Sequence, residues 1–352
     1  MGDSPIYLDN QATTPVDPRI VQAMLPYFTE LFGNPHSDGH PYGWQANAIV
    51  EQSRAVVGQL IRADTREIVF TSGATESCNL ALRGIANASS ETRRKIVTLA
   101  TEHSCVLETC EALGEEGFDI VILPVKPDGI VDLDVVRDAV DDRTLIVSVM
   151  IANNEIGVIQ PVKEIVEICR KNGVFTHSDA TQAVGKIPVD VRSLDIDFLS
   201  FSAHKLYGPK GIGALFVNWN RFKNVKPIVT GGGQERGLRP GTVAVPLVVG
   251  FGEACRISSE EMTDDIEHTI KLKNLLYDLL VESKPDIHLF GHQINRLPGN
   301  LNIGFPGIPG DEIIERVGEQ IAMSTGSACS SVSVKASHVI SAFEWKRYSP
   351  MD

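Results

Sequence analysis

Two periodicities of apolar residues alternate along the chain between about residues 48 and 220. Short continuous apolar runs, typical of buried β-strands, are separated by segments in which apolar residues recur every three or four positions, typical of amphipathic helices. The predicted strands cover residues 68–70, 96–99, 120–123, 145–150, 174–177 and 197–201. This alternation predicts an α/β domain with a mostly parallel sheet.

Some of the predicted helices are also marked by their ends. One begins with Pro161 and stops before Gly173, which is the asymmetry expected of a helix start and a helix end. Apolar residues at helical spacing predict two further helices, around residues 49–60 and 77–85. A longer amphipathic pattern from 254 to 282 predicts a helix that leads into a smaller C-terminal domain. A chain of 352 residues has room for both domains.

The net charge and the cysteine content indicate which classes of binding partner to exclude and which cellular location to expect. The net charge of −13 argues against a nucleic-acid or anionic-membrane partner, because both bind basic surfaces. No apolar run approaches the ~20 residues that span a membrane, and the N-terminus resembles neither a signal peptide nor a transit peptide. The six cysteines form no CxxC pair and show no metal-ligand spacing. We therefore expect reduced thiols, most of them in the core, and a cytoplasmic location.

Lys205 is the most informative candidate residue. It follows the apolar run 196–201 and a few small residues, and it comes just before a Gly-Pro turn. Poor solvation at such a position disfavours the ammonium form and releases the amine. Amines of this kind form Schiff bases, notably with pyridoxal phosphate (PLP). A single lysine at a strand end is more often an ordinary loop residue, so this interpretation depends on its neighbours in the fold.

Four further groups follow predicted strands. The segment 71–76 (Thr-Ser-Gly-Ala-Thr-Glu) places small and hydroxyl residues at a helix N-terminus, where backbone amides bind phosphate. Asp179 could pair with the PLP ring nitrogen, His103 could lie against the ring and move protons, and the segment 153–155 (Asn-Asn-Glu) adds amide donors. Singly, each is as well explained as a helix cap or a structural residue. Together they predict a PLP site, because ligands gather at the carboxyl ends of parallel strands.

These motifs also carry a family resemblance. The chain closely resembles the PLP-dependent cysteine desulfurases of the class-V aminotransferase family, over nearly its whole length up to about Ile340. The matching segments are residues 7–15, 32–35, 68–79, 101–103, 153–157, 178–182, 202–205, 231–242 and 324–329.

The resemblance implies a fold and a set of roles. The implied fold is that of a fold-type-I (aspartate-aminotransferase-like) PLP enzyme, with a large mixed-sheet α/β domain at residues 15–255. A smaller α+β domain would be formed by residues 1–14 and 256–352. Catalysis is expected from Lys205, Cys329, His103 and Asp179. PLP is expected to contact Ala74, Thr75, His103, Asn154, Asp179, Gln182, Ser202, His204, Lys205 and, from the neighbouring subunit of a homodimer, Thr242. No metal is expected.

Cys329 lies among small polar residues with no apolar periodicity, which is typical of a loop rather than of the core. With the PLP constellation, it is predicted to attack the sulfur of L-cysteine and to keep that sulfur as a persulfide. Family members continue further beyond this cysteine, through an arginine that binds the substrate carboxylate. Arg347 comes too early after Cys329 to match it, so we expect a small domain truncated at its C-terminus and a weakened grip on the carboxylate.

The leading functional hypothesis is an L-cysteine desulfurase that releases L-alanine and delivers sulfur to an acceptor protein, for iron–sulfur clusters or tRNA thiolation. Selenocysteine lyase is the alternative within the enzymes, because it shares the PLP motifs. A non-catalytic, PLP-binding scaffold is the alternative from another class. Formation of alanine from cysteine separates the scaffold from the enzymes, and the relative rates with cysteine and selenocysteine separate the two enzymes.

Overall fold

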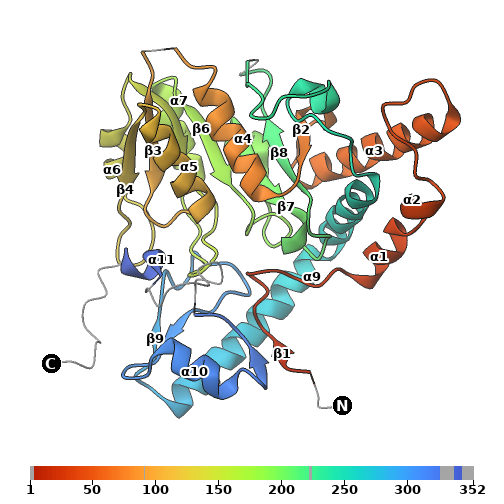
Figure 1. Ribbon diagram of the computed structural model, residues 1–352. Coiled ribbons are helices and arrows are strands. Elements are labelled where there is room, and N and C mark those ends of the chain that lie inside the picture. Colours follow the sequence, from red (N-terminus) through yellow and green to blue (C-terminus); the bar gives the residue numbers. More distant parts are fainter. Residues whose placement is uncertain (1–3, 91, 222–223, 326–336, 343–352) are drawn as a thin grey trace.

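A seven-stranded mixed sheet forms the centre of the larger part of the molecule (Figure 1). The computed structural model describes residues 4–90, 92–221, 224–325 and 337–342. Along the sheet the strands follow the order β2-β8-β7-β6-β5-β3-β4. Their bounds are β2 Ile68–Thr71, β3 Lys95–Leu99, β4 Asp119–Leu123, β5 Thr144–Ser148, β6 Phe175–Asp179, β7 Phe198–Ser202 and β8 Gly213–Val217.

The apolar runs form strands because both faces of the sheet are covered. Every residue of β3, β5, β7 and β8 is buried, as expected for central strands between two helical layers. The edge strand β4 is more exposed. The prediction of a mostly parallel α/β sheet is confirmed. The set of predicted strands was incomplete, because β8 was not among them; it pairs antiparallel with both β2 and β7.

Helices cover both faces of this sheet. Alternate strand residues enter two separate apolar cores: Val69 and Ile96 pack with α4 and α5, while Phe70 and Val97 pack with α3, α7 and α9. Figure 1 shows α4 and α5 in front of the sheet. The helix bounds are α1 Pro18–Met24, α2 Pro26–Thr29, α3 Pro41–Leu60, α4 Ala74–Ala86, α5 Ser104–Glu115, α6 Leu133–Ala139, α7 Val162–Lys171, α8 Val191–Leu194, α9 Val245–Ser283, α10 Gly310–Val317 and α11 His338–Ser341. Short 3₁₀ turns occupy Thr65–Glu67, Ala203–Lys205 and Gln234–Gly237.

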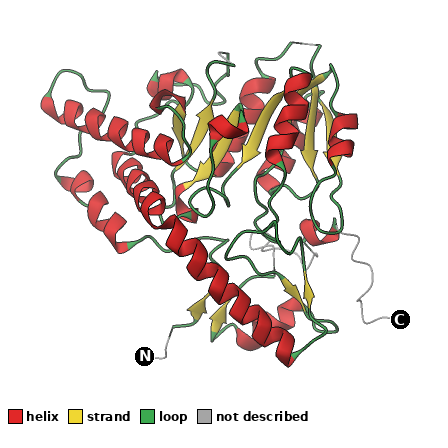
Figure 2. Ribbon diagram, turned by 180° about the vertical axis from the view of Figure 1, so that it is seen from behind, coloured by secondary structure: helices red, strands yellow, loops and turns green. Residues whose placement is uncertain are grey.

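A smaller group of elements lies at one end of the large sheet, where segments from both ends of the chain meet. Strand β1 (Ile6–Tyr7) pairs in parallel with β11 (Ile321–Ala322), and β9 (His288–Leu289) pairs antiparallel with β10 (Ile303–Gly304). Helix α9 begins beside the large sheet and runs to this group as one continuous helix (Figure 2). The predicted amphipathic helix is therefore correct but begins nine residues earlier, at Val245 instead of residue 254. Its C-terminal half carries exposed leucines, among them Leu272, Leu275 and Leu279.

The described helices include none with the combination of length and apolar character needed to cross a membrane.

Candidate active site

The predicted site residues follow strands that end at one edge of the large sheet. In the register of the sheet, Thr71 at the end of β2 lies opposite Gly213, and Gly213 lies opposite Ser202 at the end of β7. Asp179, at the end of β6, pairs with Ser200 of β7. Because β2, β3, β5, β6 and β7 run in the same direction, their carboxyl ends form one rim. The sequence prediction that these strand ends meet is confirmed.

The N-terminus of α4 lies at this rim beside Ser202. The helix begins at Ala74 and Thr75, directly after Gly73, whose φ of +156° and ψ of −179° are essentially restricted to glycine. A Cβ at Gly73 would lie 4.0 Å from the Ser202 hydroxyl oxygen. A Cβ at Gly213 would be only 2.7 Å from the Cα of Gly73, so close approach requires glycine there. The first amides of α4 and the Ser202 hydroxyl therefore lie together, as an anion site requires.

Glu76 is the acidic residue in the first turn of α4, and a carboxylate there would oppose a bound phosphate. Its carboxylate is engaged elsewhere: it accepts a hydrogen bond from the Ser72 amide at 2.6 Å and one from Arg239 Nε at 2.8 Å. The Arg239 and Ser72 hydrogen bonds lower the pKa of Glu76 although its burial opposes this. The charge of Glu76 is thus paired within the protein and does not exclude an anion from the helix N-terminus.

Basic groups gather beside this helix N-terminus, around the turn that carries Lys205. Burial, followed by the positive charges of Lys205, Lys210 and Lys186, lowers the pKa of His204 to about 4. Burial and the charge of Lys205 lower the pKa of Lys186 to about 7. Several cations within electrostatic reach of one another favour a bound anion, because an anion relieves their mutual repulsion.

An N-terminal segment, Gln11–Thr14, closes over these basic groups. The Lys205 amine donates hydrogen bonds to the backbone oxygens of Gln11 and Ala12, and the Lys210 amine donates to that of Thr14. The His204 ring Nδ1 is 3.0 Å from the Thr13 hydroxyl oxygen. These acceptors are neutral oxygens, so the segment fixes the side chains without cancelling their charge.

Gln182 belongs to the same network. Its Nε2 donates to the backbone oxygen of Gln11 at 2.9 Å, and its Oε1 accepts from the Lys186 amine at 2.8 Å. Gln182 is buried, and both its amide nitrogen and its amide oxygen have hydrogen-bond partners. The sequence motif identified Gln182, whereas Lys186 and Gln11 were not assigned a role. Lys186 follows Gln182 by four residues in a turn. This spacing does not predict a contact between the two side chains from the sequence alone, because the turn has to be known first.

Asp179 and His103 occupy the other side of the rim. Asp179 is buried, and its Oδ1 accepts a hydrogen bond from the Thr181 amide at 2.8 Å. His103 caps α5, because its Nδ1 accepts from the Cys105 amide at 3.2 Å. A neutral His103 whose Nδ1 accepts this hydrogen bond carries its proton on Nε2. His103 can therefore serve as the cap of α5 and also move protons at the site.

Asn154 is positioned by its neighbour. The Asn153 side chain donates to the backbone oxygen of Thr101 at 2.8 Å, and its Oδ1 accepts from the amides of Glu155 and Ile156. Asn153 is completely buried, and Asn154 is partly exposed at the rim. The pair thus divides into one residue that shapes the loop and one that can contact a ligand.

Cys329 lies outside the described residues, as does Arg347, but the described residues on either side of the Cys329 segment are anchored near the rim. Ser324 donates a hydrogen bond to Asp9 at 3.1 Å, just before the Gln11–Thr14 segment. Ser337 donates to Glu155, whose pKa is raised to about 7 by burial. Thr242, the residue predicted to contact a neighbouring subunit, is exposed in the single chain.

The rim fits PLP on the chemistry of its donors. A helix N-terminus, a hydroxyl and several cations suit the phosphate, and a buried carboxylate suits the ring nitrogen. The five cysteines in the described part of the chain are free thiols and buried, as predicted for core residues. Two of them, Cys78 and Cys105, lie beside Asp179, which their sequence spacing did not indicate.

Known proteins resemble this chain in sequence over most of its length. The model of the class-V aminotransferase family matches residues 6–344. A cysteine desulfurase IscS of Rickettsia peacockii (strain Rustic) is 51% identical over 336 residues, which cover 96% of this chain and 82% of that protein. The IscS of Rickettsia typhi (strain Wilmington) is 50% identical over the same shares of both chains.

Solved structures agree in fold. A NifS-like protein superposes with a TM-score of 0.90 at 37% identity, covering 98% of this chain and 91% of that one. SspA, solved in complex with cysteine, gives a TM-score of 0.85 at 34% identity, covering 97% and 95%. The predicted fold-type-I architecture is therefore confirmed, with the antiparallel β8 making the sheet mixed.

Proposed function

The chain belongs to the class-V aminotransferase family, and on that premise we propose that it is a PLP-dependent cysteine desulfurase. In this proposal it converts L-cysteine to L-alanine and passes the sulfur through Cys329 to an acceptor protein, for iron–sulfur clusters or tRNA thiolation. The observation that carries the proposal is the rim itself, where a basic cluster and a helix N-terminus face the same edge as the buried carboxylate of Asp179. The buried, unpaired cysteines favour a reducing compartment such as the cytoplasm.

Two groups of residues would hold the cofactor. The phosphate would be bound by the α4 amides at Ala74 and Thr75, by Ser202 and by His204, with Lys186 and Lys210 adding positive charge. Asp179 would bind the ring nitrogen, Gln182 and Asn154 would contact the ring or the substrate, and His103 would lie against the ring. When bound, PLP withdraws electrons from the substrate and so stabilises negative charge on its carbon atoms.

Proton transfers would be carried out by Lys205 and His103. The Lys205 amine would hold PLP covalently and, once released from it, would take and return protons at the substrate carbon. Its hydrogen bonds to Gln11 and Ala12 hold the amine at the rim. The α5 cap fixes His103 so that Nε2 is the nitrogen that holds or releases a proton.

Sulfur transfer needs a nucleophile other than the lysine. The Cys329 thiolate would attack the sulfur of L-cysteine, forming an S–S bond while the C–S bond breaks and its electron pair goes to the substrate carbon. Protonation of that carbon gives L-alanine, and the extra sulfur stays on Cys329 as a persulfide. The step balances without an external oxidant. Anchoring of Ser324 and Ser337 near the rim supports the assignment, because it keeps both flanks of this segment close to the substrate.

A homodimer is part of the proposal. Large apolar side chains are exposed on α1, α2 and the adjoining segment up to the start of α3, including Phe28, Phe32 and Trp44 at 56%, 63% and 57% exposure. Large apolar side chains exposed on neighbouring elements favour an interface here. With Thr242 also exposed, a second copy of the chain is the partner we expect, and sedimentation of the PLP-loaded protein should give twice 38.3 kDa.

The deciding experiment is an assay of alanine released from L-cysteine by the PLP-loaded protein. The Cys329→Ala variant should still bind PLP and take up cysteine but should form no protein persulfide, while Cys110→Ala, at a buried thiol of α5, should behave as wild type. A PLP-loaded protein that releases no alanine would favour the scaffold. A faster reaction with selenocysteine than with cysteine would favour the lyase.

A further inference from the structure

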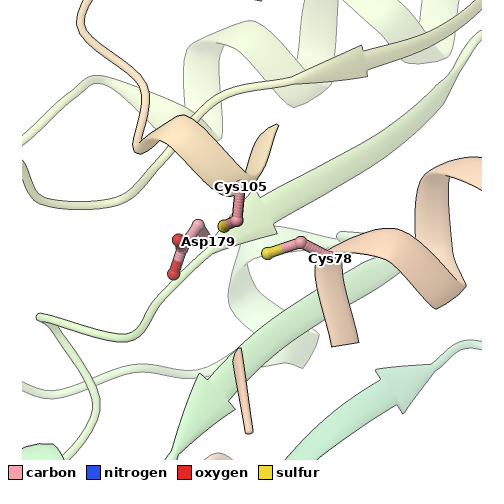
Figure 3. Close-up of side chains that lie close together, drawn as sticks. All are labelled: Cys78, Cys105 and Asp179. Carbon is pink, nitrogen blue, oxygen red and sulfur yellow. The ribbon is translucent and has the colours of Figure 1, made fainter. Parts of the chain in front are cut away.

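Two cysteines at the rim have no part in the proposed sulfur transfer, and they lie beside Asp179, which has one. Cys78 on α4, Cys105 on the first turn of α5 and Asp179 at the end of β6 converge from three separate elements, and Figure 3 shows the two cysteine side chains pointing toward each other beside Asp179. The two sulfur atoms and a carboxylate oxygen all lie within 4.8 Å of one another. The exposed fractions of the three residues are 0%, 8% and 5%. Two thiols and a carboxylate concentrated in a buried space are the ligand types of a soft divalent cation.

We propose that Cys78, Cys105 and Asp179 form a binding site for a thiophilic divalent cation such as Zn²⁺, and that this cation competes with the cofactor for Asp179. Metal binding by the two thiols stands independently of the proposed function. The competition rests on that function, because it assumes that Asp179 is the partner of the PLP ring nitrogen.

The geometry is close to that of a metal site. Two sulfurs bound to one tetrahedral zinc ion at ~2.3 Å lie about 3.8 Å apart. Against the observed limit of 4.8 Å, the side chains need to move by about 1 Å at most. The three elements are fixed: α4 and α5 pack in one apolar core against the sheet, and β6 is a central strand. The ligands therefore start near their bound positions, and little backbone movement is needed.

The protonation of the thiols also suits a cation. Hydrogen bonding to Cys78 and to His103 lowers the pKa of Cys105 to about 7, although burial opposes this. The same pairing and complete burial raise the pKa of Cys78 well above its ordinary value. A bound cation would displace the proton of Cys78 to solvent, as metal ligation by cysteine requires.

Asp179 links this cluster to the cofactor site. One of its oxygens already accepts the Thr181 amide hydrogen bond, so a cation on the side of the thiols and a ring nitrogen at the rim would draw on the same carboxylate. A cation would neutralise the charge that the ring nitrogen needs. Cofactor-free protein should therefore bind the cation, and loaded protein should resist it.

The test uses the full-length chain in its PLP-free form. It carries the Cys329→Ala change, so that the Cys329 thiol does not contribute to metal binding. Under argon and with a non-thiol reductant, the protein is titrated with Co²⁺, whose sulfur charge-transfer and d–d absorption report tetrahedral thiolate binding. We expect the protein to bind about one equivalent of Co²⁺ per chain, and Zn²⁺ should displace it.

Cys78→Ser and Cys105→Ser should each weaken the affinity for Co²⁺ at least about tenfold and reduce the sulfur band. Cys110→Ser, a buried thiol of the same α5 outside the cluster, is the matched control and should change neither.

Absence of a sulfur band, or a band that survives both serine changes, would overturn the site. If Cys78→Ser does not fold, Cys105→Ser decides alone, since either change removes one of the two sulfur ligands. For the competition, PLP uptake by Zn²⁺-loaded protein should be at least about tenfold weaker than by metal-free protein. Equal uptake would overturn the competition while leaving the metal site intact. A protein that takes up no PLP even without metal would count against the proposed function. The cobalt spectrum would still test the metal site in that case.

Discussion

The two ends of the candidate site present opposite charges, and the protein protects each charge in a different way. At the basic end, Lys186, Lys205 and Lys210 donate hydrogen bonds to neutral oxygens of Gln182 and of residues 11–14, and these hydrogen bonds hold the amines in place without adding negative charge. At the acidic end, burial keeps two ionisable groups near Asp179, His177 and Glu102, in their neutral forms. Burial lowers the pKa of His177 to about 4 and raises that of Glu102 well above its ordinary value.

This difference explains how one rim can serve a phosphate and a ring nitrogen. A bound anion relieves the mutual repulsion of these cations, so the basic end favours the phosphate. At the other end, the neutral forms of His177 and Glu102 leave the Asp179 carboxylate available to an opposite charge such as that of the ring nitrogen. We therefore expect changes at the basic end to affect attachment of the cofactor, and changes at Asp179 to affect its reactivity.

The largest effect should follow from Lys205→Ala. Removal of the amine eliminates covalent attachment and the main acid–base group together, so alanine release should fall by at least about 10⁴-fold. Lys210→Ala removes an exposed amine of the same cluster and is the matched control, with only weaker PLP binding expected. Borohydride reduction followed by peptide mapping should find PLP at Lys205 in the wild-type protein. Mapping to another lysine would show that the assignment is wrong.

A smaller but selective effect is expected from Asp179→Asn. The amide can still accept the Thr181 hydrogen bond, whereas the charge opposite the ring nitrogen is lost. Turnover should fall about 10²- to 10³-fold, the size of effect seen when one electrostatic contact to a transition state is removed. PLP absorbance should show that loading persists. Loss of loading with normal turnover per bound PLP would contradict the division between the two ends.

The smallest effect is a change in the pH dependence of stability. Lys186 has a pKa of about 7 in the fold against 10.5 when unfolded, so between these values the unfolded chain binds more protons. The free energy of unfolding of the PLP-free protein should therefore rise with pH across this window. Lys186→Met should flatten the rise, while Lys210→Met should not.

Urea unfolding at several pH values between 7 and 10.5 measures this slope. Inorganic phosphate should reduce the slope in the wild-type protein, because a bound anion favours the charged amine and raises its pKa. A slope that is the same in wild type and Lys186→Met would place Lys186 outside the basic end.

The sequence by itself determined the parallel strands and predicted most of the residues of the candidate site. Continuous apolar runs mark β3, β5 and β7 because both faces of these strands are buried, and a residue just after such a run must lie at the rim. Asp179 and Lys205 could be assigned in this way. The family motifs added Gln182, Ser202 and Thr242, which no local pattern distinguishes.

Only the tertiary structure decided the remaining features. The direction of β8 depends on its neighbours β2 and β7, because an apolar run of five residues has the same pattern in either direction. The closure by Gln11–Thr14 and the cation of Lys186 depend on contacts between distant segments. Cys78 and Cys105 each looked like a core thiol, and both are buried as expected. That they face Asp179 together follows from how α4 and α5 pack against β6, since local periodicity fixes which face a residue lies on and not what it meets there.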